Sequence, residues 1–138
     1  MSDRVFLDTN FVIYLYSNTE TAKCELAYSI VNSNICITST QVFNEASNVW
    51  SKKFKWPTEQ IKTYLDGIKS VCNSVVLIRL QTINQALNLK ERYGYSFYDS
   101  LMLASAIEAN CKTMFSEDMQ DGQLINGSLR IVNPFAKP

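Results

Sequence analysis

Four carboxylates occupy positions where acidic side chains often form a site: Asp8, Glu45, Asp99 and Asp118. Asp8 and Asp118 each follow a short apolar segment that is typical of a buried strand. Asp99 opens the apolar segment YDSLMLASAIEAN, which indicates a central helix. Carboxylates that converge repel one another, and without a cation they would have to take up protons. A hard divalent cation such as Mg²⁺ or Mn²⁺ removes this conflict, and such an acid-only site indicates phosphoryl chemistry.

Each of these acids also has a purely structural interpretation. Asp8 is a good N-cap for a helix that follows the first strand. Ser96 and Asp99 have the spacing of a capping box. Glu45 shares a helical face with three apolar residues of TQVFNEASNVW, where an acid must be paired, hold a metal or extend to water. Each signal alone leaves both interpretations open, whereas the four acids together favour a site.

The side chains that are missing narrow the chemistry further. The chain has no histidine, which excludes a histidine general base, a Ser-His-Asp triad and every His-containing zinc site. Its four cysteines form no CxxC pair. Cys36 lies in the apolar segment ICI and Cys72 follows Val71, so we expect buried free thiols rather than a disulfide framework.

Size and charge indicate a single domain that spans residues 1–138. A chain of this length can fold around one core. With 13 basic and 13 acidic residues its formal net charge is zero, which excludes a protein that coats nucleic acid through bulk charge. The segment MSDRVFLDTN does not resemble a signal peptide, and the most apolar stretch, Leu101 to Ile107, is too short to span a membrane. We therefore expect a soluble, cytoplasmic protein.

Apolar strands alternate with helical segments along the chain. The expected strands are residues 5–7, 35–37, 75–78, 113–115 and 129–132. The expected helices are residues 10–17, 20–33, 41–53, 58–72, 82–93 and 97–110, with Thr38, Ser39 and Thr40 as candidate N-caps of the third. This alternation predicts an α/β fold with a central, mainly parallel sheet covered on both faces. In such sheets the functional crevice lies beyond the carboxyl ends of the strands, where Asp8 and Asp118 stand.

Four segments, in their order and spacing, resemble one known family. The sequences FLDTNFVIYL, FNEASNV, YSFYDSLMLASAIEANC and TMFSEDMQDG look like the motifs of a PIN domain, and especially of the VapC-type toxins of toxin–antitoxin pairs. The resemblance extends over essentially the whole chain, including the closing SLRIVNPF. It implies a three-layer α/β/α fold and a ribonuclease that needs Mg²⁺ or Mn²⁺ and cuts single-stranded or structured RNA.

The resemblance also implies a role for each of the four acids. Asp8 and Asp99 would be metal ligands, and Glu45 would orient the metal or its water. Asp118 would complete the site directly or through a water molecule. The implied reaction is in-line attack of water on an RNA phosphodiester, which leaves a 3′-hydroxyl and a 5′-phosphate.

Other residues and partners are implied in the same way. Thr9 or Asn10, together with Ser116, would hold the carboxylates and waters by hydrogen bonds. The position of the family's fourth acid varies, and here Asp118 is the better match, after Ser116, while Asp121 is available three residues on. The implied partners are an RNA substrate, a second copy of the chain in a homodimer, and a cognate antitoxin that inserts a segment near the site.

A basic run follows the expected Glu45 helix. Lys52, Lys53 and Lys55 are interleaved with Phe54 and Trp56. In some RNA-binding proteins the lysines of such a run bind phosphate and its aromatic side chains stack on a base. More often, such a run is a solvated helix end whose aromatic side chains pack inward.

Three other functions compete with this interpretation. A haloacid-dehalogenase-like phosphatase needs a second acid two residues after the first, where this chain has Asn10. A receiver domain needs an acid after a central strand, but Thr38 and Arg79 follow the expected strands there. The stronger alternative is a catalytically weak module that binds RNA or a partner protein. The presence of all four acids favours the enzyme.

Overall fold

The computed structural model describes residues 3–136, which form six strands and six helices around one sheet. The strands are β1 (Arg4–Leu7), β2 (Ile35–Ser39), β3 (Ser74–Val76), β4 (Thr113–Phe115), β5 (Leu124–Ile125) and β6 (Leu129–Val132). The helices are α1 (Thr9–Leu15), α2 (Thr21–Ser33), α3 (Thr40–Lys52), α4 (Thr58–Val71), α5 (Leu80–Tyr93) and α6 (Phe97–Glu108).

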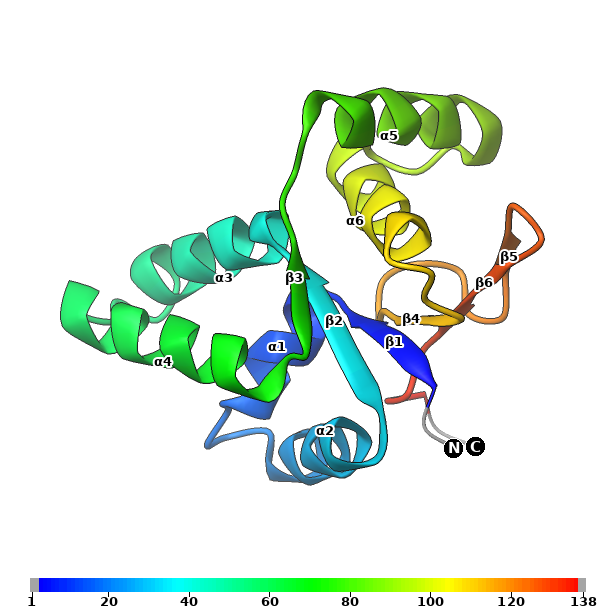
Figure 1. Ribbon diagram of the computed structural model, residues 1–138. Helices are drawn as coiled ribbons and strands as arrows, with labels where there is room; N and C mark the ends of the chain where they lie inside the picture. Colours follow the sequence, from blue (N-terminus) through cyan, green and yellow to red (C-terminus); the bar gives the residue numbers. More distant parts are fainter. Residues whose placement is uncertain (1–2, 137–138) are drawn as a thin grey trace.

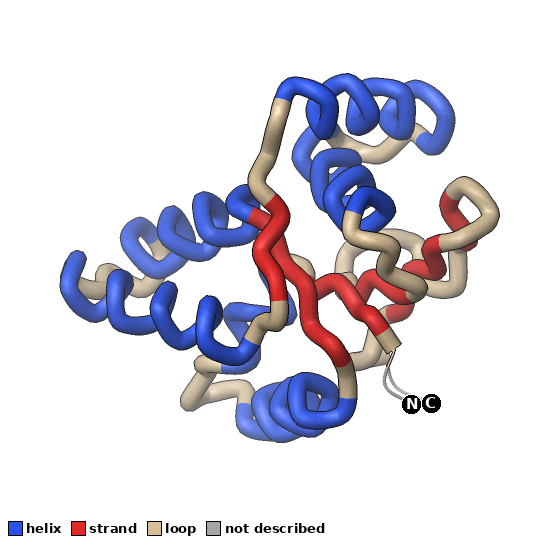
Figure 2. Tube along the Cα trace, in the orientation of Figure 1, coloured by secondary structure: helices blue, strands red, loops and turns tan. Residues whose placement is uncertain are grey.

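The sheet has the order β3-β2-β1-β4-β6-β5, and only β5 runs antiparallel to its neighbour. Strand β1 lies at its centre, where Phe6 is in register with Ile37 of β2 and Met114 of β4. These three side chains are fully buried. Strands of a parallel sheet are covered on both faces, which explains why these segments are apolar. Figure 2 shows helices on both sides of the central strands, which confirms the predicted α/β fold.

The helices differ in how deeply they are buried. Helix α6 packs on α5 and on the sheet, and its residues 100–106 are all buried, which confirms the prediction of a central helix. Helices α3 and α4 pack side by side and extend away from α5 and α6 (Figure 1). This arrangement places the first turn of α6, the exposed side of α3 and the carboxyl ends of β1 and β4 around a common region.

Several predicted boundaries are wrong by a few residues, each for a local reason. The third strand ends at Val76 rather than at residue 78, because the Ile78 N–H donates to the Thr40 hydroxyl at 3.2 Å instead of to a strand. The last long helix ends at Glu108 rather than at residue 110, because Asn110 adopts a left-handed backbone with φ of 59°. The two-residue strand β5 was not predicted.

The structure tests the predicted N-cap of α3 and the prediction of free cysteine thiols. Ser39 stands at the N-cap of α3, but its hydroxyl makes no capping bond and lies 3.9 Å from the Met102 sulfur. All four cysteines are free, and Cys24 is the one among them that is not buried. None of the helices within residues 3–136 is long and apolar enough to cross a membrane.

Candidate active site

The four acids singled out from the sequence line a single pocket of about 220 Å³. The pocket lining consists of Asp8, Thr9, Asn10, Glu45, Asn48, Val49, Asp99 and Asp118. The four carboxylates come from four separate places: the end of β1, the middle of α3, the first turn of α6 and the loop after β4. Such convergence of acids far apart in sequence is typical of a functional site.

Asp8 lies at the central strand's carboxyl end. It is 7% exposed, and its Oδ1 accepts a hydrogen bond of 2.6 Å from the Thr9 N–H, so it also caps the short helix α1. Since Leu7 is in register with Phe115, the residues that follow β1 and β4 emerge at the same edge of the sheet. Asp8 therefore both caps α1 and lines the acidic pocket.

Glu45 is half-buried beside the apolar face of α3 and does not simply extend to water. Its Oε1 accepts a hydrogen bond of 2.9 Å from the Thr9 hydroxyl. Its Oε2 accepts one of 3.1 Å from the Gln41 side-chain amide, one helical turn away. Both oxygens are thus held in place, which fixes the carboxylate at the pocket wall.

Asp99 is placed by the start of α6. The Ser96 hydroxyl accepts a hydrogen bond of 3.2 Å from the Asp99 N–H, which confirms Ser96 as the N-cap. The Asp99 side chain lines the acidic pocket. The cap therefore positions the backbone of Asp99 at the pocket.

The carboxylates of the pocket influence one another electrostatically. Burial raises the pKa of Asp8 to about 7, and the nearby charges of Asp99 and Glu45 add to the rise. Hydrogen bonds from the Thr9 N–H and the Ser116 hydroxyl partly offset this shift in the Asp8 pKa. Burial also raises the pKa of Asp99, with the charges of Glu45 and Asp118 contributing. The pocket thus concentrates negative charge that no cation of the described residues neutralises.

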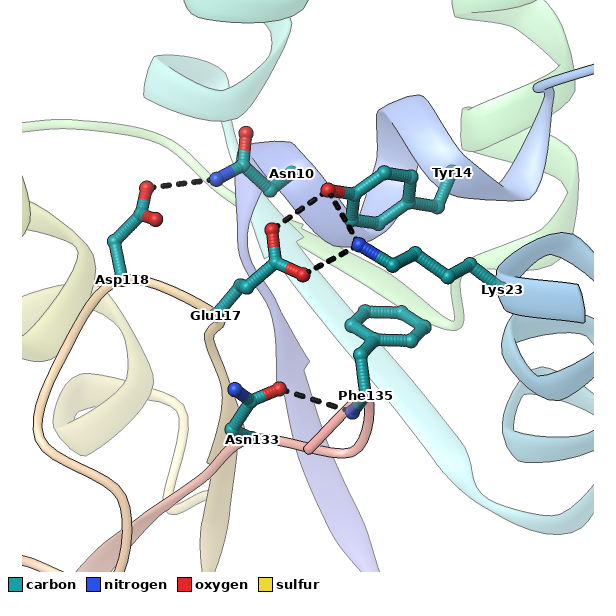
Figure 3. A network of polar contacts seen from close by, with 7 residues as sticks. All are labelled: Asn10, Tyr14, Lys23, Glu117, Asp118, Asn133 and Phe135. Carbon is teal, nitrogen blue, oxygen red and sulfur yellow. Dashed lines mark hydrogen bonds and ion pairs between the residues drawn. The ribbon is translucent and has the colours of Figure 1, made fainter. Parts of the chain in front are cut away.

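The loop after β4 separates the two candidates for the fourth acid. The Asp118 carboxylate accepts a hydrogen bond of 2.7 Å from the Asn10 side-chain amide and lines the pocket (Figure 3). Asp121 instead accepts a hydrogen bond of 2.8 Å from the Asn133 N–H and does not line the pocket. Of the two, Asp118 is the one that the fold brings to the other three acids.

A separate polar network holds the same loop. Glu117 forms an ion pair of 2.8 Å with Lys23 of α2 and accepts a hydrogen bond of 2.6 Å from the Tyr14 hydroxyl of α1. Lys23 also donates to that hydroxyl at 3.1 Å and lies over the Tyr14 ring, which meets Phe135 edge to face. Burial alone would raise the pKa of Glu117. The hydrogen bonds from Lys23 and Tyr14 outweigh this effect and lower the Glu117 pKa below its usual value. Figure 3 shows this network beside the Asn10–Asp118 contact, so it anchors the residue that precedes Asp118.

The donor set of the pocket fits a hard divalent cation. Within residues 3–136, no three acidic or thiol side chains stand close enough, as placed, to hold an ion directly. Mg²⁺ in proteins is commonly held by one or two carboxylates and several waters, and it requires oxygen ligands. Asp8 at the end of β1 and Asp99 in the first turn of α6 line this pocket and could hold such an ion. Glu45 and Asp118 line the same pocket and could contact the ion or its waters.

Two other predictions concern residues around the acids. Ser116 is buried, and its hydroxyl hydrogen bond to Asp8 lowers the pKa of that carboxyl, while its role in holding waters stays a prediction. In the basic run, Lys53 and Phe54 are exposed, whereas Trp56 stacks on the buried Trp50 with ring centroids 5.0 Å apart. The inward-packing interpretation is therefore right for Trp56 and wrong for Phe54.

Two polar residues near the acids were missed from the sequence. Asn48 lines the pocket and Gln41 holds Glu45. They stand three residues after and four residues before Glu45, so both share its helical face. That spacing was the available signal, but amides at such spacing are also common on solvated helices.

The comparisons with known proteins give one family and one fold. The PIN domain profile matches residues 5–120. VapC20 from Mycobacterium tuberculosis, described as a sarcin-ricin loop cleaving toxin, is 18% identical, with a TM-score of 0.65 over 83% of this chain and 89% of that chain. A toxin–antitoxin complex from Klebsiella pneumoniae is 19% identical, with a TM-score of 0.70 over 95% of this chain and 98% of that chain.

A further solved structure has the same fold. VapBC2 from Rickettsia felis, bound to a DNA fragment from its promoter, is 19% identical, with a TM-score of 0.66 over 94% of this chain and 99% of that chain. No curated protein matches the sequence.

Proposed function

Because this chain belongs to the PIN domain family, we propose that it is a divalent-metal-dependent endoribonuclease and the toxin of a toxin–antitoxin pair. One observation carries the proposal: four acids from four separate elements line a single pocket at the carboxyl edge of the sheet. An oxygen-only site of this kind suits Mg²⁺ or Mn²⁺ and the chemistry of phosphodiesters.

The residues of the pocket have different roles in the proposed reaction. When bound, a divalent cation supplies positive charge that stabilises the charge developing on the phosphate. Asp8 and Asp99 would hold that cation. Glu45, fixed by Thr9 and Gln41, would orient the cation or a water molecule. Water attacks phosphorus and the bond to the 3′-oxygen breaks, which leaves a 3′-hydroxyl and a 5′-phosphate.

The fourth acid and the partners complete the proposal. Asp118, held by Asn10, would complete the site directly or through a water molecule. The similar fold of a solved toxin–antitoxin complex supports an antitoxin as partner, and that of a toxin named for cleaving the sarcin-ricin loop supports RNA as substrate. A homodimer in the cytoplasm belongs to the same proposal.

The experiment that tests this function measures cleavage of a mixed RNA pool with Mn²⁺, with Mg²⁺ and with EDTA. Asp99→Asn, which keeps the side-chain shape and removes its charge, is compared with Asp66→Asn on the exposed side of α4. We expect metal-dependent cleavage by the native chain and by Asp66→Asn, and at least about a hundredfold loss in Asp99→Asn. Equal cleavage by all three proteins would reject the site, and retention of RNA without cleavage would favour the binding module.

A further inference from the structure

Three adjoining hollows run along the exposed side of α3, and the acidic pocket is the middle one. On one side lies a hollow of about 360 Å³, here called the amide hollow, which shares Glu45 and Asn48 with the acidic pocket. The amide hollow is lined by Gln41, Asn44, Glu45, Asn48 and Tyr98. Tyr98 stands at the start of α6 and is 58% exposed.

On the other side lies a hollow of about 330 Å³, here called the lysine hollow. It shares Asn10 and Val49 with the acidic pocket, and Lys53 and Phe54 belong to its wall. Phe54 is 42% exposed, and the Lys53 Nζ lies 5.8 Å from the centre of its ring. The amide hollow and the lysine hollow are each of the size of a small-ligand site.

One helical stripe joins these hollows into a continuous path. The residues of α3 and its C-cap that line the hollows follow one another at three- and four-residue spacing, from Gln41 to Lys53. Since a helix rises 1.5 Å per residue, this path is about 18 Å long. It begins near one exposed aromatic ring, passes the acids, and ends at a second exposed ring beside a lysine.

The side chains along this path match the parts of an unpaired RNA strand. Aromatic faces stack on bases that are not already stacked in a duplex, and amides hydrogen-bond base edges and 2′-hydroxyl groups. Single exposed aromatic residues are common on protein surfaces, but Tyr98 and Phe54 flank an acidic pocket on opposite sides. Lys53 adds a positive charge that can contact a backbone phosphate.

We propose that an unpaired RNA strand lies along this stripe of α3, with one base against Tyr98 and another against Phe54. Asn44 and Asn48 contact the nucleotide on the Tyr98 side, and Lys53 contacts a phosphate on the Phe54 side. A duplex is not bound in this way, because its bases are stacked internally and do not reach either ring. The inference rests on the proposed function, since it assigns the side chains that hold an RNA strand across the acidic pocket.

The test measures RNA binding separately from cleavage. All proteins carry Asp99→Asn, and fluorescence anisotropy reports the affinity for a labelled RNA of about ten nucleotides, either unpaired or annealed to its complement. Tyr98→Ala and Phe54→Ala are compared with the ring-preserving Tyr98→Phe and Phe54→Tyr, and with Tyr28→Ala, an exposed tyrosine of α2 outside the three hollows. Circular dichroism melting checks that each variant folds.

We expect each of the two ring deletions to weaken unpaired RNA about tenfold, while the ring-preserving variants and Tyr28→Ala stay near the parent. Duplex RNA should bind weakly to every protein. Unchanged affinity for unpaired RNA in both Tyr98→Ala and Phe54→Ala would overturn the proposed RNA path. It would instead favour contact of these two rings with a protein partner. Tighter binding of the duplex would overturn it as well.

A cleavage assay with the native Asp99 separates this inference from the proposed function. Metal-dependent cleavage whose rate and nucleotide preference are unchanged by Tyr98→Ala and Phe54→Ala would reject the path and keep the nuclease. Ring-dependent binding of unpaired RNA without any cleavage would keep the path and reject the nuclease. Cleavage in which the preferred nucleotides flanking the cut change in both variants supports the two together.

Discussion

Replacing Asp8 by asparagine should make the protein more stable at neutral and basic pH when no divalent ion is present. Asp8 is 7% exposed, and no ion pair of the described residues includes it. Burial, with the charges of Asp99 and Glu45, raises its pKa from 3.8 to about 7. Asparagine has the same shape, carries no charge and is an equally good N-cap, so the bond to Thr9 is kept.

The sign and size of the effect follow from this pKa. The folded chain holds a proton on Asp8 up to about pH 7, whereas the unfolded chain releases it near pH 4, so the folded state binds more protons between these values. The free energy of unfolding therefore falls as pH rises through this window, by about 4 kcal/mol for a shift of about three pKa units. Between pH 5 and pH 8 the Asp8 contribution to this fall is about 3 kcal/mol.

Urea unfolding in EDTA at pH 5, 6, 7 and 8 measures this difference directly. Other titrating groups, including Asp99, are present in both proteins and largely cancel in the comparison of native chain and Asp8→Asn. The native chain should lose about 3 kcal/mol more than the variant over this range. Parallel pH profiles would refute the argument that Asp8 is an unpaired buried acid.

Divalent ions provide the second half of this test. At pH 8, Mn²⁺ at a hundred times its dissociation constant should raise the free energy of unfolding of the native chain by about 3 kcal/mol. Asp8→Asn should gain much less, because a neutral amide is a weaker ligand than a carboxylate. Equal stabilisation of both proteins by Mn²⁺ would contradict the proposal that Asp8 is a metal ligand.

Three further predictions concern the loop after β4 and the packing of α4. Asp118→Asn should lower Mn²⁺-dependent cleavage about tenfold or more in an RNA cleavage assay, whereas Asp121→Asn, outside the acidic pocket, should stay within about twofold. Lys23→Met removes the ion pair that anchors this loop and should raise the Mn²⁺ concentration needed for half-maximal cleavage severalfold, while Lys23→Arg should restore it. Gly67→Ala should lower the melting temperature, because a Cβ there would lie 2.9 Å from the Tyr16 hydroxyl, and combining it with Tyr16→Phe should recover up to about 1 kcal/mol through helix propensity.

The fold could be predicted largely because its strongest signals are local. Residues 5–7 of β1 and most residues of α6 are apolar, so the composition of these segments predicted that they are buried. Strand β5 could not be predicted, because its two residues become a strand only by pairing with β6. The end of α6 depended on the left-handed backbone of Asn110, and asparagine occurs inside helices as well as after them.

The grouping of the four acids could be predicted from the sequence, but the contacts that support them could not. Asp118 and Asp121 are three residues apart in one loop, and what separates them is tertiary: Asn10 holds one and the Asn133 N–H holds the other. The role of Gln41 depends in the same way on Glu45 being turned toward the pocket. Contacts of this kind require the fold to be known first.

The capping and catalytic interpretations of the acids are complementary rather than exclusive. Asp8 caps α1 through Oδ1, and the Ser96 cap fixes the backbone that carries Asp99 at the start of α6. A site for a metal ion needs carboxylates of fixed orientation, and a helix cap provides such orientation from local sequence alone. Placing Asp8 at this cap buries an acid without a cation beside it among the described residues, and burial raises its pKa. A measurement of the Asp8 pKa would therefore test this site directly.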